Sequence, residues 1–112
     1  MNIVLFNHIL DGNIELNNGN YIEALKKYKE ILKATNDFNL IATYKSGICF
    51  MKLGEYNKAI TFFNEVLQVN PLHRDTLLKL SYCYMQSQKY KEMIAICDKI
   101  YTLDNNFVLE AI

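Results

Sequence analysis

The side chains able to do chemistry are few in this sequence, and they are widely spaced. The two histidines, His8 and His73, have no Cys, Ser or carboxylate at a spacing typical of a metal site or an activated nucleophile. Asp11 and Glu15 form an i, i+4 carboxylate pair, which on a helix face is typical of a solvated surface. The sequence also lacks a glycine-rich phosphate loop. We therefore expect a non-enzymatic protein with no catalytic residues, no metal and no cofactor.

The cysteines point the same way. Cys49, Cys83 and Cys97 are odd in number, lack CxxC spacing and fall inside helical patterns. This arrangement predicts reduced, buried thiols rather than disulfides or a metal site.

The composition indicates one folded domain. The chain has 112 residues, 51% of them hydrophobic, and its twelve basic and twelve acidic residues cancel. A neutral chain lacks the broad positive field typical of proteins that bind nucleic acid or anionic membranes. The apolar runs are too short to span a bilayer, and polar residues interrupt the apolar start before a signal sequence could form. We expect a cytoplasmic, intracellular protein that binds neither nucleic acid nor membrane.

The elements that position these residues follow a repeat of 34 or 35 residues. Between Leu40 and His73, two amphipathic segments are separated by Gly54-Glu55, which predicts a helical hairpin. The period is typical of helical solenoids. A forward shift of 34 residues aligns Phe50 with Tyr84, Tyr56 with Tyr90, Phe63 with Cys97 and Val66 with Ile100; a backward shift of 35 aligns Gly47 with Gly12, Gly54 with Gly19, Ala59 with Ala24 and Phe63 with Tyr28.

Helical periodicity and turn residues predict where the helices lie. Gln88 replaces the glycine of the earlier turns, so we expect its turn to be less regular. Asp104, Asn105 and Asn106 are expected to cap a further helix that starts at Phe107. The predicted helices are 3–17, 21–34, 40–53, 56–69, 73–87 and 90–103. In the sixth helix the positions expected to be buried are Tyr90, Met93, Ile96, Cys97, Ile100 and Tyr101.

The first unit has two interpretations. Its strip His8, Asp11 and Glu15 is polar where later units are more apolar, which is expected of the terminal unit of a solenoid, whose outer face meets water. Alternatively, Asp11-Gly12 disturbs the helix and changes its register.

The third and fifth helices carry a second apolar strip in addition to the one that packs within the hairpin. On the third helix it recurs at i, i+3, i+7 and i+10. The strip comprises Ile41, Tyr44, Ile48 and Met51 on the third helix, and Leu78, Tyr82 and Met85 on the fifth.

The hairpin is similar to the tetratricopeptide repeat (TPR). The resemblance rests on Gly47, Phe50, Gly54, Tyr56, Ala59, Phe63, Leu67 and Pro71, and it extends over nearly the whole chain. It implies an all-α fold, a right-handed α-solenoid of antiparallel hairpins. It also implies a single domain, residues 1–112, with repeats at about 5–39, 40–73 and 74–107, and with 108–112 starting a capping or fourth helix. Members of this family are usually scaffolds that hold a peptide or helix of a partner protein.

The same resemblance places the second apolar strip in a concave groove. Lysines along this groove would favour acidic residues on an amphipathic helix or extended segment. The predicted groove residues are Ile9, Asn13, Leu16, Ile41, Tyr44, Lys45, Ile48, Met51, Lys52, Leu78, Lys79, Tyr82 and Met85.

One TPR subgroup, a class of co-chaperones, clamps the C-terminal carboxylates of chaperones. Of its clamp residues only Asn13 matches here, with Lys79 as a conservative replacement. Asp75 stands at another clamp position and would repel a carboxylate. Binding of chaperone tails is therefore not the favoured interpretation.

Self-association is the alternative function. The end of the chain is apolar where solenoids usually carry a polar capping face. Phe107, Val108, Leu109 and Ile112 could pair with a second copy to form a homodimer or fill the groove of a neighbour.

Overall fold

The computed structural model describes residues 3–36 and 38–111, with side chains up to residue 105. These residues form α-helices joined by short turns, without a strand among them. The helices are α1 (Ile3–Asn17), α2 (Tyr21–Ala34), α3 (Leu40–Lys52), α4 (Tyr56–Val69), α5 (Arg74–Gln86) and α6 (Tyr90–Ala111). From α1 to α5, each helix begins and ends within one residue of its predicted bounds.

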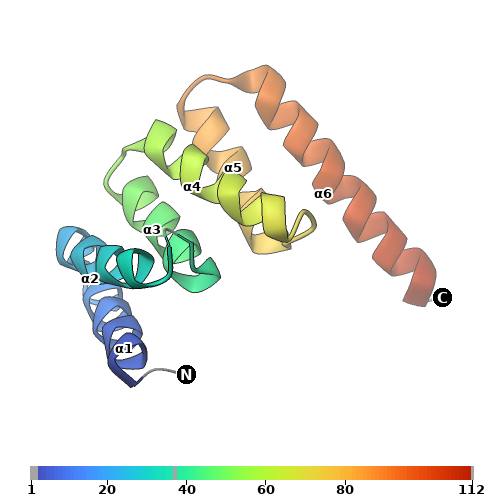
Figure 1. Cartoon of the computed structure of the whole chain (residues 1–112). Coiled ribbons are helices and arrows are strands. Elements are labelled where there is room, and N and C mark those ends of the chain that lie inside the picture. The colour runs from blue at the N-terminus through green and yellow to red at the C-terminus, as the bar shows by residue number, and fades with distance from the viewer. Residues whose placement is uncertain (1–2, 37, 112) are drawn as a thin grey trace.

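The helices pack in chain order, each against the next, as Figure 1 shows. The Cα radius of gyration is 15.2 Å, whereas a compact globular chain of this length would have about 13 Å. The fold is therefore an elongated α-solenoid, and the predicted all-α class is confirmed.

Two clusters of buried side chains form the core. The first surrounds Tyr28, and the second surrounds Phe63 and Leu77; all three side chains are fully buried. Helix α3 joins the clusters, because Cys49 belongs to the first while Met51 packs against the second. The core is therefore continuous along the array, as stacking of small helical units requires.

Two glycines let the paired helices of a hairpin approach each other closely. A Cβ atom on Gly12 would lie 2.7 Å from the Tyr28 ring, and one on Gly47 would lie 2.6 Å from the Phe63 ring. The two hairpins therefore use the same contact in the same register. Helix α1 also runs unbroken through Asp11, so the alternative in which Asp11-Gly12 disturbs the helix is wrong.

The three turns inside the hairpins share one geometry. Gly19 and Gly54 have φ values of 80° and 78°, and Gln88 adopts a φ of 60° at the equivalent place. Each turn closes with the same type of hydrogen bond, of which the Lys89 N–H to Tyr84 carbonyl bond is 2.8 Å long. The expectation of a less regular third turn is therefore wrong: Gln88 adopts the left-handed conformation although it carries a side chain.

Helix α6 continues past the position where the sequence predicts a break. It runs without interruption from Tyr90 to Ala111, so the predicted cap and the new helix at Phe107 are wrong. Asp104 does not cap a helix; its carboxylate instead accepts two hydrogen bonds from the Arg74 guanidinium, at 2.8 and 3.0 Å. These bonds hold the pKa of Asp104 below its usual value. The stretch also lacks proline or glycine, which would have ended the helix.

Several apolar residues of α6 are exposed rather than buried. Tyr90 is 54% exposed and Tyr101 70%, and Cys97 is exposed too. These three expectations of burial are wrong because, among the described residues, α6 packs mainly against α5, whereas α4 packs between α3 and α5.

The cysteines lead to a labelling prediction. Burial raises the pKa of the Cys49 and Cys83 thiols to about 11, so at neutral pH both stay protonated and unreactive. In dilute native protein, a thiol reagent should modify Cys97 rapidly and the other two orders of magnitude more slowly. Mass spectrometry of the labelled peptides measures this order. Equal labelling rates for all three thiols would contradict it, and denaturant should abolish the difference.

Candidate functional site

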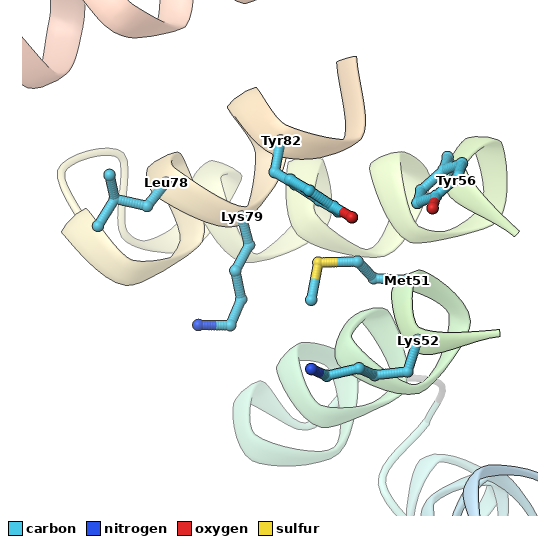
Figure 2. Close-up of a pocket in the computed structure, with 6 residues that line it drawn as sticks. All are labelled: Met51, Lys52, Tyr56, Leu78, Lys79 and Tyr82. Carbon is cyan, nitrogen blue, oxygen red and sulfur yellow. The ribbon is translucent and has the colours of Figure 1, made fainter. Parts of the chain in front are cut away.

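The apolar strips of α3 and α5 meet at a hollow of about 510 Å³, shown in Figure 2. Both helices contribute one lysine and apolar side chains to its wall, and α4 contributes one tyrosine from its first turn. The lining residues are Met51, Lys52, Tyr56, Leu78, Lys79 and Tyr82.

Two tyrosines form one end of this hollow. The rings of Tyr56 and Tyr82 meet edge to face, with centroids 6.1 Å apart. A side-chain hydrogen bond with Tyr82 raises the pKa of Tyr56 above its ordinary value, so the Tyr56 hydroxyl remains protonated at neutral pH. Tyr56 is missing from the predicted groove because its helical position indicated only core packing.

A smaller hollow of about 160 Å³ lies near the start of α3. Tyr44 forms part of its wall, with its ring 5.4 Å from that of His73 and 6.1 Å from that of Phe63 in the core. The Lys79 ammonium lies 5.6 Å from the centre of the same Tyr44 ring, a favourable cation–π geometry. Because Lys79 also lines the larger hollow, this contact links the two. The lining residues are Leu40, Ile41, Tyr44, Lys45, Val66 and His73.

We define the groove as the residues that line these two hollows. Of the predicted groove residues, the structure brings Ile41, Tyr44, Lys45, Met51, Lys52, Leu78, Lys79 and Tyr82 together here. Ile48 is half-buried against the core, and Met85, 43% exposed, lies outside both linings.

The predicted residues of α1 lie elsewhere. Ile9 is only 9% exposed and belongs to the core, and Leu16 packs against the same cluster. Asn13 accepts a hydrogen bond of 2.6 Å from the Tyr28 hydroxyl, so its side-chain oxygen is already engaged within the fold. Leu10, which aligns with Lys45, is instead 43% exposed. The alignment of Leu10 with Lys45 could have assigned Leu10 to the face of α1 that corresponds to the groove side of α3.

The chemistry available in the groove is that of binding. Lys45, Lys52 and Lys79 supply positive charge beside exposed apolar surface, and Figure 2 shows Lys52 and Lys79 extending from facing helices on either side of Met51. In the part of the chain that the structure describes, no three His, Cys, Asp or Glu side chains are grouped as metal ligands. None of the described helices combines the length and apolar character needed to cross a membrane.

Comparison with known families agrees with this geometry. Residues 14–108 match the family described as the N-terminal TPR repeats region of psidin. The chain belongs to the TPR family. TPR proteins are protein-interaction scaffolds, and the predicted membership of this family is confirmed.

Relatives of known sequence are much longer chains. The TPR repeat-containing protein MJ1428 of Methanocaldococcus jannaschii is 44% identical over 62 residues, which cover 55% of this chain and 11% of that protein. The CTR9 homolog of Arabidopsis thaliana is 31% identical over 76 residues, covering 68% of this chain and 7% of the relative. The matched segments thus span about a tenth of the length of these relatives.

Solved TPR structures share the fold. The TPR2B domain of yeast Sti1, solved as a complex with pHsp70, superposes with a TM-score of 0.82 at 16% identity, and the match covers 94% of this chain and 83% of that one. The Sgt2 TPR domain of Aspergillus fumigatus gives 0.77 at 17% identity, covering 91% and 67%. At such identities the likeness concerns the fold, which this TPR module shares with both domains.

Proposed function

We propose that this TPR module is a scaffold that binds an amphipathic helix or extended apolar segment of a partner protein in the groove. The observation that carries this proposal is the exposure of apolar side chains beside a formed hollow. Leu78 is 39% exposed, Tyr82 43% and Ile41 43%, all on the groove side of α3 and α5. Contiguous apolar surface of this kind is typical of binding sites.

The lysines specify the chemistry of the partner. The described lining of both hollows includes Lys45, Lys52 and Lys79 but no Asp or Glu. A partner with acidic residues flanking an apolar stripe would therefore gain attraction at the rim and burial at the centre. Chaperone-tail binding is less favoured, because the matching clamp residue, Asn13, is engaged by Tyr28.

A displayed library of helical and extended peptides tests the proposal. Peptides selected on the wild-type protein should be apolar with acidic flanks. Tyr82→Glu and Leu78→Glu should each weaken their binding by about tenfold or more, because each places a carboxylate at the apolar centre of the site. Fluorescence anisotropy with one selected peptide measures the change in dissociation constant.

The matched control is Ile22→Glu, which introduces the same charge at an α2 position that is 61% exposed and distant in sequence from the groove helices. It should leave the affinity unchanged. Selected peptides that bind both groove variants as tightly as the wild type would contradict the proposal. Failure of the library to yield any peptide with acidic flanks would contradict the role of the lysines.

The second candidate function, self-association through the end of the chain, stays a prediction. Phe107, Val108 and Leu109 are helical in backbone, but their side chains, like Ile112, lie outside what the structure describes. The observation that favours self-association at this end is the exposed apolar face of α6, noted above at Tyr90 and Tyr101.

We also propose that the protein works in a reducing, cytoplasmic compartment. All three cysteines are free, and two of them are buried in the core. Unpaired thiols of this kind are typical of intracellular proteins.

A further inference from the structure

Helix α6 carries an exposed apolar stripe along one face. Tyr90, Ile94, Cys97 and Tyr101 are spaced by four, three and four residues, which places them in one row on a helix. Tyr90, Ile94 and Tyr101 are 54%, 56% and 70% exposed, and Cys97 is exposed as well. We call these four residues the α6 stripe.

The repeat itself indicates what such a stripe is for. The positions 34 residues earlier in α4 are Tyr56, Ile60, Phe63 and Leu67. There Ile60 is 7% exposed and Phe63 is fully buried, because α4 is packed between α3 and α5. The α6 stripe is therefore the face to which a further helix would dock if the array continued, and within the described residues nothing covers it.

The N-terminal end of a second copy would cover this face poorly. In α5, Leu77, Leu80 and Tyr84 face α4 and pack in or against its core cluster. Two repeats earlier, the equivalent positions in α1 are His8, Asp11 and Glu15. Head-to-tail stacking would press two carboxylates onto an apolar surface and desolvate them, which is costly. Another α6 is the better match.

The spacing of the α6 stripe, four, three and four residues, is the same from either end of the helix. Two α6 helices crossing antiparallel about a point between Ala95 and Ile96 would place Tyr90 opposite Tyr101 of the second copy. Ile94 would face Cys97 of the second copy in the same way. An interface in which each residue meets its reciprocal partner is what a twofold dimer requires.

Charges along one flank of the stripe are complementary under the same operation. Lys91 and Asp98 are exposed and seven residues apart, so they lie on the same side of α6. In an antiparallel pair each lysine would lie within reach of the aspartate of the other copy, which forms two reciprocal ion pairs. A parallel twofold pairing would instead place this flank of the two copies on opposite sides of the interface, so these ion pairs would not form.

We propose that this chain forms a symmetric antiparallel homodimer through the α6 stripe. The contact is small, so the dimer is weak and depends on concentration. None of the stripe residues lines the groove, which stays open to a partner in both copies. The dimer is therefore independent of the proposed groove binding, and either can fail without the other.

Light scattering and sedimentation equilibrium of the 112-residue chain, from micromolar to several hundred micromolar, test the dimer. The wild type should pass from the mass of one chain to that of two. Ile94→Glu should raise the dissociation constant by about tenfold or more, since it places two carboxylates at the centre of the interface. Ile22→Glu, at a similarly exposed position on α2, should not change it.

Charge reversal tests the antiparallel register. Lys91→Asp and Asp98→Lys should each weaken the dimer, because both reciprocal ion pairs then face like charges. The double variant should recover the wild-type constant, as the pairs are re-formed with exchanged sides. Labelling of Cys97 should also slow as the dimer forms.

A wild-type protein that stays monomeric throughout this range would overturn the proposal, as would a dimer unaffected by Ile94→Glu. If Ile94→Glu weakens the dimer but the double variant of Lys91→Asp and Asp98→Lys does not recover the wild-type dissociation constant, the antiparallel arrangement is overturned. Peptide binding to the groove, measured on the same Ile94→Glu variant, should equal that of the wild type, which separates the two proposals.

Discussion

Replacing Phe63 by alanine should lower the free energy of unfolding by about 3–5 kcal/mol. Phe63 is fully buried and packs within a cluster that includes Leu77 and Leu80 from the next repeat. The truncation removes buried apolar area and leaves a cavity between helices that cannot all close in on it. A single domain of this size is stable by only about 5–15 kcal/mol, so the loss is a large part of the total.

Urea denaturation followed by circular dichroism measures this change. Phe62→Ala is the matched control, because Phe62 is the neighbouring phenylalanine but is only half-buried, where its ring meets Phe50 at a centroid distance of 5.3 Å. Phe62→Ala should lower the free energy of unfolding by clearly less than Phe63→Ala does. Equal losses at the two positions would mean that Phe63 is not the centre of the core contact.

The same substitution should weaken the groove. The Phe63 ring lies beneath Tyr44, with centroids 6.1 Å apart, and Tyr44 forms part of the groove wall. Removing Phe63 leaves Tyr44 without its support, so peptide affinity should fall even where the variant remains folded. The groove is therefore shaped by the core packing of the hairpin that carries it.

Replacing Gly47 by valine should destabilise the fold by about 3 kcal/mol, at the upper end of the usual cost of overpacking. A Cβ at this position would lie 2.6 Å from Cε1 and 2.8 Å from Cδ1 of Phe63, and valine adds two methyl groups beyond it. Because the ring is held on all sides in the core, α3 and α4 must move apart to admit the new side chain.

Two comparisons isolate the cause. Lys29→Val places valine at an exposed position inside α2, where it has the low helix propensity of valine but meets no clash. It should lower the free energy of unfolding by less than about 1 kcal/mol. Combining Gly47→Val with Phe63→Leu should cost less than the sum of the two single changes, because the smaller side chain makes room. Additive losses would show that the contact of Gly47 with Phe63 is not what makes glycine necessary.

The groove was predictable on α3 and α5 and was not on α1. On α3 and α5, a row of apolar residues beyond those needed for the hairpin indicated a second surface, and the structure places Met51, Leu78 and Tyr82 in one hollow. On α1 the alignment alone assigned Ile9 to the groove, although this residue packs in the core. A position equivalent in sequence is equivalent in exposure only when the side chains around it are also equivalent.

The sequence by itself determined the repeat, the fold class and the bounds of the first five helices. These depend on local physics: helical periodicity over three turns, glycine where the backbone turns left-handed, and proline where a helix must stop. Each signal is complete within a few residues, so it can be read without knowing what packs nearby.

Only the tertiary structure decided which apolar positions are covered and where α6 ends. Ile60 is buried and Ile94 is exposed although they occupy the same place in the repeat, because α5 packs on the first and no described helix packs on the second. Asp104 lies within α6 rather than capping a helix, and its carboxylate pairs with Arg74, thirty residues earlier. Burial and ion pairing depend on contacts between residues far apart in the chain, and these contacts cannot be inferred from the local sequence.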